Sequence, residues 1–275
     1  IIEQGGATLA MDVSVLKGPT QPTDISKHDV ANAAGSTIEK TIALDDENEA
    51  MQIMANGACQ LTAQAYSDGK IDGVVILGGS MGTDLALDVC GSLPLGFPKY
   101  IISTIAFSPL LPTERIPADV QMILWAGGLY GLNSICKASL SQAAGAVLGA
   151  AKSLEKQDTN KPMVGMTSFG KTVLQYMVTL KPALEARGYE VAVFHPTGMG
   201  GRAFEDLAAQ GRFVCVMDFA TQEIGNHLFG SVVSAGPNRL TAAAIAGVPQ
   251  IVAPGCHDLV DFPGWQDLDA RWENH

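Results

Sequence analysis

The stretch Gly73-Val74-Val75-Ile76-Leu77-Gly78-Gly79-Ser80-Met81-Gly82-Thr83 shows the pattern that decides the fold of this chain. A short apolar run over residues 71–77 leads into a glycine-rich turn, and a helical pattern follows it. Backbone N–H groups at the start of such a helix can bind an anion without any charged side chain. A second copy, His195-Pro196-Thr197-Gly198-Met199-Gly200-Gly201-Arg202, occurs further along the chain. The two copies predict strand–loop–helix units, each with a possible anion site.

Short aliphatic runs alternate with helical patterns that commonly end in glycine along the whole sequence. The predicted strands cover residues 7–15, 71–77, 99–104, 120–124, 163–167, 190–194, 213–218 and 249–253. The predicted helices cover residues 26–34, 45–66, 84–90, 132–154, 172–187, 202–210, 221–229 and 237–246. Such alternation is typical of βαβ units, whose parallel sheets are covered on both faces. The predicted fold class is α/β, with two three-layer Rossmann-like domains and mainly parallel sheets.

A polar segment at residues 155–161, closed by Pro162, is the clearest predicted linker. It divides the chain into an N-terminal domain at residues 1–158 and a C-terminal domain at residues 159–275. The first residues, Ile1-Ile2-Glu3-Gln4-Gly5-Gly6, have the pattern of a helix end with a glycine stop. We therefore expect an earlier strand to be missing, and the abrupt ending at His275 suggests that the C-terminal domain is truncated as well.

The composition restricts the possible partners. The 275 residues carry a formal net charge of −11, which argues against binding long nucleic acid through its phosphates. No apolar run reaches the ~18 residues of a membrane span. The 5 cysteines are scattered and lack metal-ligand spacing, which is typical of reduced thiols in a cytoplasmic protein.

Ligands of parallel α/β sheets bind beyond the carboxyl ends of the strands. The first glycine loop matches neither GxxxxGK[ST] nor GxGxxG, and it could simply turn the chain. The second loop is the stronger candidate because the Arg202 guanidinium could bind an anion. The alternative is that Arg202 pairs with Glu205 or Asp206. The candidate nucleotide- or anion-binding residues are Gly78, Gly79, Ser80, Met81, Gly82, Thr83, Ser103, Thr104, Thr167, Ser168, Phe169, Gly170, Gly198, Met199, Gly200, Gly201 and Arg202.

Three further residues are candidates for acid/base or Mg²⁺ contacts. His195 could be an acid/base group or could hydrogen-bond its own loop. Asp218 and Glu223 could hold the Mg²⁺ that accompanies a nucleotide, or Glu223 could compensate a helix dipole. The neighbours His257 and Asp258 should point apart on an extended strand, so they are not expected to form a dyad. The sequence predicts no protein-only metal site and assigns no catalytic residue.

Six runs occur in one fixed order over residues 7–262, and together they carry a family resemblance. They are DGVVILGGSMGTDLA, FPKYIIST, GLNSICKASLSQAAGAVLGA, KPMVGMTSFG, ALEARGYEVAVFHPTGMGGRAFEDL and SAGPNRLTAAAIAGVPQIVAPGCHDLVDF. This set resembles the N-terminal ATP-binding domain of the tomato mosaic virus resistance family, plant inhibitors of viral RNA replication with uncharacterised bacterial and fungal relatives. The resemblance implies a homodimer of two α/β halves that binds ATP, with Mg²⁺ as a possible companion. Cys256-His257 stands where Ala-Leu-like residues are usual in that family.

Three functions remain open from the sequence. The first is a nucleotide-binding protein of unknown reaction that holds ATP in a cleft between its two domains. The second is a metal-independent enzyme acting on a small carboxylate or phosphorylated metabolite, with Arg202 and the glycine loops binding the anion and His195 as acid/base. The third is a non-catalytic interaction module.

Overall fold

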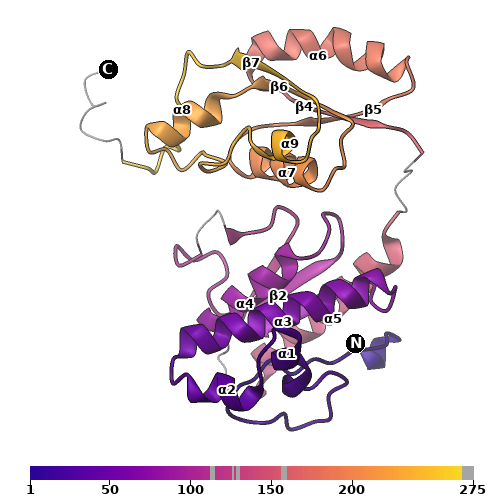
Figure 1. The fold of residues 1–275 in the computed structure, drawn as a ribbon, viewed down its shortest axis with the longest axis vertical. Helices are drawn as coiled ribbons and strands as arrows, with labels where there is room; N and C mark the ends of the chain where they lie inside the picture. The colour runs from indigo at the N-terminus through magenta and orange to yellow at the C-terminus, as the bar shows by residue number, and fades with distance from the viewer. Residues whose placement is uncertain (112–114, 126, 128–130, 156–159, 268–275) are drawn as a thin grey trace. The chain divides into compact units, whose positions relative to one another are not determined.

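The computed structural model describes residues 1–111, 115–125, 127, 131–155 and 160–267 (Figure 1). Two compact units, Ile1–Glu155 and Lys156–His275, make up the chain. The predicted domain boundary between residues 158 and 159 lies outside the described residues, as does the C-terminal end at 268–275. Each unit contains a parallel sheet with helices packed against it, so the predicted α/β class is confirmed.

The sheet of the first unit has the order β1-β2-β3, and its strands are parallel. These strands are β1 (Val74–Gly78), β2 (Lys99–Ser103) and β3 (Gln121–Leu124). All residues of the central strand β2 are buried, as expected for a strand covered on both faces. Even Lys99 is buried, and its Nζ lies 2.8 Å from the Asp119 carboxylate, which compensates the charge.

The helices of the first unit are α1 (Lys27–Ala33), α2 (Ile38–Ala43), α3 (Glu47–Ser67), α4 (Ser80–Gly91) and α5 (Ser134–Ser153). Four of them begin at a residue whose side chain accepts a hydrogen bond from the first turn. These capping residues are Ser26, Thr37, Asp46 and Asn133. Only α4, which follows β1 directly, lacks such a side-chain cap among these five helices.

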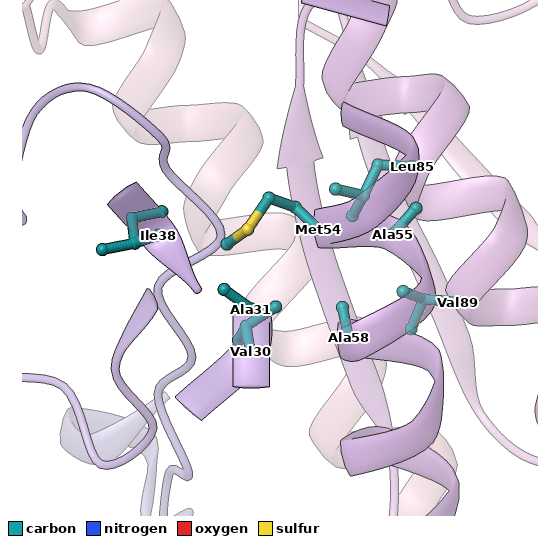
Figure 2. Packing of buried hydrophobic residues seen from close by; sticks show 8 residues of the cluster. All are labelled: Val30, Ala31, Ile38, Met54, Ala55, Ala58, Leu85 and Val89. Carbon is teal, nitrogen blue, oxygen red and sulfur yellow. The ribbon is translucent and has the colours of Figure 1, made fainter. Parts of the chain in front are cut away.

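The predicted strand at residues 7–15 is wrong. That segment makes only an isolated bridge, between Met11 and Ile25. Its alternating apolar side chains, Met11, Val13 and Val15, pack instead against a cluster formed by the first helices. Figure 2 shows the buried members of that cluster, which are Val30, Ala31, Ile38, Met54, Ala55, Ala58, Leu85 and Val89. The apolar side chains at every second position therefore form one face that packs on helices, and the described segment does not join a sheet.

The sheet of the second unit has the order β5-β4-β6-β7, again with parallel strands. Its strands are β4 (Met163–Thr167), β5 (Glu190–Phe194), β6 (Cys215–Ala220) and β7 (Gln250–Gly255). The chain leaves β4 in one direction to form β5 and then crosses back over to form β6. The two central strands β4 and β6 therefore send their following connections in opposite directions.

The helices of the second unit are α6 (Gly170–Glu185), α7 (Met199–Ala209), α8 (Gln222–Leu228) and α9 (Ala242–Ile245). Figure 1 shows α6 on one face of the sheet and α7 with α9 on the other. Buried Val173 and Met177 of α6 pack against Val164 and Met166. On the opposite face, Phe204 and Ala208 of α7 pack with Phe213, Val216 and Ala243. No helix in the described residues is both long and apolar enough to cross a membrane.

Candidate functional site

The first glycine loop is shorter than predicted. Gly78 ends β1, Gly79 is the N-cap, and Ser80 already begins α4. A Cβ on Gly78 would lie 2.4 Å from the backbone carbon of Gly82, so glycine is required by the tight turn itself. Thr83 is buried, and its hydroxyl lies 2.7 Å from that of Ser103. These two predicted ligand-binding hydroxyls therefore bond to each other and join α4 to β2.

The carboxyl edge of the first sheet is largely apolar at its surface. The Thr104 N–H donates to the Gly78 carbonyl, so this backbone donor is also used within the fold. Large apolar side chains are exposed at or just beyond the strand ends, namely Leu77, Met81, Phe107, Leu110 and Leu124. Such a surface favours apolar contacts over a phosphate, so the better polar site is in the second unit.

The second glycine loop is built around a buried carboxylate. The Gly198 N–H donates to Glu223 Oε1 at 2.5 Å, and Gly198 has φ +85. A Cβ on Gly201 would lie 1.9 Å from Glu223 Oε2, and one on Gly200 would lie 1.9 Å from the His195 carbonyl oxygen. These close approaches require the glycines whether or not a ligand binds. They also place a negative charge against the positive end of α7, where it opposes a ligand anion.

Arg202 and Met199 belong to the first turn of α7, which begins three residues earlier than predicted. Arg202 is half-buried, and its Nη1 lies 3.7 Å from the Met199 sulfur. His195 is exposed, with Nδ1 3.3 Å from the Thr197 hydroxyl. The loop-bonding alternative for His195 is thus present in the structure.

Asp218 and Glu223 are both bonded to a residue that the sequence analysis missed, Arg239. Its Nε donates to Glu223 Oε2 at 2.8 Å, and its Nη2 donates to Asp218 Oδ1 at 2.7 Å. Its Nη1 donates to Asp218 Oδ2 and, at 2.8 Å, to Glu205 Oε1. The Arg239 side chain is 2% exposed, and those of Asp218 and Glu223 are 0% exposed. We call Arg239, Asp218, Glu223 and Glu205 the arginine hub.

Burial and the contacts within the arginine hub shift the pKa values of Glu223 and Arg239. Burial raises the pKa of Glu223, and the bonds from Arg239 and from the Gly198 N–H oppose that rise. Burial alone would lower the pKa of Arg239, but the hydrogen bonds and charges of Asp218 and Glu223 raise it. The predicted Mg²⁺ contacts of Asp218 and Glu223 are therefore replaced by contacts with the guanidinium. In the part of the chain that the structure describes, no group of three or more His, Cys, Asp or Glu residues could hold a metal ion.

Thr167, another predicted ligand-binding residue, joins strands instead. Its hydroxyl donates to Asp218 Oδ1 at 2.7 Å and accepts from the N–H groups of Phe219 and Ala220, each at 3.0 Å. Thr167 is fully buried. It thus links the end of β4 to β6 and to the arginine hub.

The start of α6 differs from the start of α7. Only Ser168 and Phe169 lie between β4 and α6, and the first turn of α6 has neither a side-chain cap nor an acidic residue. Gly170 has φ +66, a left-handed conformation that favours glycine. The Phe169 ring lies 5.1 Å from the His195 ring, so the loops after β4 and β5 are in contact. Lys171 in this first turn is exposed.

A sequence signal for this helix start was overlooked. Residues Gly165-Met166-Thr167-Ser168-Phe169-Gly170-Lys171-Thr172 match the letters GxxxxGK[ST]. The structural context differs from a P-loop, in which the glycine-rich loop cradles phosphates between strand and helix. Gly165 lies within β4, where a Cβ would be 2.8 Å from the Phe213 ring. Only Gly170-Lys171-Thr172 therefore has the expected position, at the start of the helix.

Two residues after β6 complete the edge. Gln222 Nε2 donates to the Pro196 carbonyl at 2.6 Å, so its side chain spans from the end of β6 to the end of β5, across β4. Gln222 Oε1 is buried and has no hydrogen-bond partner among the described residues. Thr221 is also buried, and its hydroxyl lies 2.7 Å from His257 Nε2.

Ligands of doubly wound sheets bind where neighbouring connections diverge, beyond the carboxyl ends of the strands. In the order β5-β4-β6-β7 that point lies between β4 and β6. Ser168, Phe169 and Gly170, which follow β4, lie at this point, and the Phe169–His195 ring contact brings His195 beside them from the end of β5. It leaves the predicted residues of the first unit in a separate unit of the chain.

Comparisons with known proteins identify the family. The N-terminal domain model of the uncharacterised protein family UPF0261 matches residues 1–156, and its C-terminal domain model matches residues 161–275. A UPF0261 protein of Brucella suis is 55% identical over all 275 residues, and the chain spans 66% of its length. A UPF0261 protein of Clostridium tetani is 39% identical over 264 residues, which are 95% of this chain and 65% of that protein.

The resemblance to the plant resistance family is also confirmed. The ToMV resistance protein Tm-1(GCR237) of Solanum lycopersicum is 35% identical over 221 residues, which are 78% of this chain and 29% of the tomato protein. Both domain models match in order and together they cover nearly the whole chain. The chain therefore belongs to the uncharacterised protein family UPF0261.

Proposed function

We propose that this chain is a nucleotide-binding protein, with ATP as the first candidate ligand, and that it binds the phosphates at the start of α6. The observation that carries the proposal is the N-terminus of α6 at the β4/β6 switch point, whose first turn has neither a side-chain cap nor an acidic residue. The first N–H groups of a helix have no partner within the helix. Together with the helix dipole they attract an anion.

The capping of most other helices supports this choice, and among the helices α1 to α7 only α4 and α7 share with α6 the lack of both a side-chain cap and a first-turn acid. Helices α1, α2, α3 and α5 start at side chains that already accept first-turn hydrogen bonds. Helix α7 starts against the carboxylate of Glu223. Helix α6 has 16 residues, no capping side chain and no acid in its first turn. Of the two helices that follow β4 and β5, α6 is therefore the one whose positive end is open to a ligand.

The basic groups near this helix support the same site. The chain has a net charge of −11, so anion binding needs a local concentration of positive charge. Lys171 lies in the first turn of α6, and the Phe169–His195 contact brings the loop that precedes α7 and Arg202 alongside. In this arrangement Mg²⁺ would be held mainly by the nucleotide phosphates, which is usual for this ion.

Isothermal titration with ATP, with and without Mg²⁺, tests the proposal. The informative variant is Lys171→Glu, and the matched control is Lys161→Glu, which alters an exposed lysine just before β4, at the opposite edge of the sheet. A hydrogen bond to a charged group contributes about 1.5–3 kcal/mol. Lys171→Glu should therefore weaken ATP binding at least tenfold, and Lys161→Glu less than twofold. No binding to the unaltered chain at millimolar ATP would refute the proposal.

Arg202→Glu distinguishes the two helix starts. If phosphates bind at α6, this change should weaken ATP binding less than Lys171→Glu does. The reverse order would move the site to α7, where the sequence alone had placed its stronger candidate. Homodimer formation, implied by the family resemblance, stays a prediction that light scattering of the purified chain can test.

A further inference from the structure

Strand β7 is an edge strand whose apolar side chains are exposed on both faces of the sheet. The order β5-β4-β6-β7 leaves one side of β7 without a neighbouring strand among the described residues. Ile251 is 51% exposed and Val252 is 50% exposed. Because successive residues of a strand point to opposite faces, one of these side chains is uncovered on each face. Among the strands that the structure describes, β7 alone exposes two large apolar side chains in succession.

The composition of β7 is that of a strand inside a sheet. Ile251-Val252-Ala253 is an unbroken aliphatic run, which is typical of a parallel strand that is covered on both faces. Edge strands commonly carry charges that block further pairing, and β5, at the opposite edge, begins with exposed Glu190. By contrast, residues 242–256 contain no charged residue. The uncovered side of β7 is therefore suited to receive another strand.

The backbone of β7 offers hydrogen-bonding groups to such a strand. The Val216 N–H donates to the Pro249 carbonyl, so Pro249 faces β6. Since the backbone groups of successive residues point alternately to the two sides of a strand, Ile251 also faces β6. Gln250 and Val252 then point their N–H and C=O groups to the open side, where a further ladder can form.

Pro254 restricts what can pair with β7. It follows Val252 by two residues, so its nitrogen points to the open side as well, but it has no N–H. The ladder on this side is therefore limited to the first part of β7. A short strand tethered within the same polypeptide can use so few hydrogen bonds, because its effective concentration is high. A second copy of the chain must first associate, and so short a ladder stabilises that association poorly.

The relatives have additional polypeptide that is long enough to supply this strand. The Brucella suis and Clostridium tetani proteins each have about a third of their length outside the part that this chain matches. A strand needs only about 5–6 residues. We therefore propose that the open side of β7 is the docking site for a further strand, which comes from the family's polypeptide outside these 275 residues. This proposal does not depend on the phosphate site at α6.

The exposed side chains of β7 determine the chemistry of the docked strand. Its side chains would lie beside Ile251 on one face of the sheet and beside Val252 on the other. Burying a charged side chain against these apolar groups is costly. The docked strand is therefore expected to be apolar on both faces, as Ile251-Val252-Ala253 itself is.

Amide hydrogen exchange tests the proposal at single residues. The 275-residue chain is compared with the whole Brucella suis protein, and electron-transfer mass spectrometry reads each amide. In the chain alone, the Val252 amide should exchange rapidly, whereas the Ile251 amide, which faces β6, should be protected. In the whole relative, the amide matched to Val252 should exchange at least about tenfold more slowly than in the chain. The amide matched to Ile251 should be protected in both proteins.

A lysine at position 252 gives a second measurement. In the 275-residue chain Val252 is half exposed, so Val252→Lys should lower Tm by less than about 2 °C. In the whole relative, the same change at the matched position should lower Tm by more than about 5 °C, because the docked strand would bury the lysine. The control is Val193→Lys on β5, where Val193 is 41% exposed, and its effect should be equally small in both proteins.

Three results would overturn the proposal. The first is equally fast exchange at position 252 in the chain and in the whole relative. The second is protection of the Val252 amide that rises with the concentration of the 275-residue chain and disappears in Val252→Lys, which would assign the open side of β7 to a second copy. The third is an equal loss of Tm from Val252→Lys in both proteins, which would show that no additional strand covers this residue in the relative.

Discussion

Replacement of Arg239 by methionine should destabilise the second unit severely. The guanidinium is 2% exposed and donates to three carboxylates, those of Asp218, Glu223 and Glu205. Methionine fills a similar volume but leaves these carboxylates buried without a cation. Breaking a buried ion pair by removing one partner costs about 3–5 kcal/mol. We expect a loss of about 4 kcal/mol and a fall in Tm of roughly 10–20 °C.

Urea unfolding followed by far-UV circular dichroism measures this loss, and the variants separate charge from packing. Arg187→Met is the matched control, because Arg187 is exposed just after α6 and its side chain bonds only to the Ala183 carbonyl among the contacts described. It should change stability by less than about 0.5 kcal/mol. Arg239→Lys keeps the charge but loses the forked geometry, so it should lie between the two.

The decisive measurement is the double variant Arg239→Met with Glu223→Gln. If uncompensated negative charge causes the loss, neutralising Glu223 should restore part of the stability in the methionine background. The same Glu223→Gln change should not stabilise the chain when Arg239 is present. Additive effects of the two changes would refute the charge argument, because coupled residues in one network are expected to be non-additive.

Three other predictions follow from the contacts. Burial raises the pKa of Glu223 above its ordinary value of 4.5, so ionising this carboxyl costs folding free energy as the pH rises above 4.5. The Glu223→Gln variant cannot ionise there, and its free energy of unfolding should therefore fall less over this pH rise than that of the unaltered chain, as urea unfolding at several pH values can measure. Thr167→Val leaves the buried N–H of Ala220 and the half-buried N–H of Phe219 without their acceptor and should cost about 2 kcal/mol or more, while exposed Thr179→Val should not. Burial raises the pKa of Cys90 to about 12, so a thiol reagent at pH 8 should modify Cys90 only when urea unfolds the chain.

The strands of the second unit could be predicted from local sequence. Residues 163–167 and 190–194 are strands with the predicted bounds, because short apolar runs bounded by Pro162 and Gly188 have few alternatives. The segment at residues 7–15 has an equally good alternation, but it packs on helices. A local pattern shows that one face is buried, and it does not show whether a sheet or a helix pair covers that face.

Helix ends near the site were harder to predict for a related reason. The predicted helix at residues 237–246 is reduced to Ala242–Ile245, since the chain first turns inward to place Arg239 in the hub. Leu240 there has φ +75, and its N–H donates to Glu205 Oε1. The partners of Arg239 lie 16–34 residues away in sequence, so no local window contains the reason for this turn.

The glycines raise the same difficulty for the site. The sequence predicts Gly78 and Gly201 as positions where the backbone approaches a phosphate. In the structure each is needed because another part of the protein approaches instead, the Gly82 backbone in one case and the Glu223 carboxylate in the other. A glycine at a strand–helix junction indicates that some group lies close to its Cα atom. Only the folded structure shows whether that group is a ligand or another part of the protein.

The starts of α6 and α7 look alike in sequence, but the charges that surround them differ. The hub beneath α7 holds three carboxylates and one guanidinium, a formal excess of negative charge. Two like charges about 4 Å apart repel by roughly 4 kcal/mol near a protein surface, which exceeds the usual gain of an anion from a helix dipole, about 0.3–1 kcal/mol. The start of α6 has no acid in its first turn, so no such repulsion opposes the phosphate that we propose to bind there. An internal carboxylate 25 residues away, which the loop sequence does not reveal, is therefore the reason that we propose α6, and not α7, as the phosphate site.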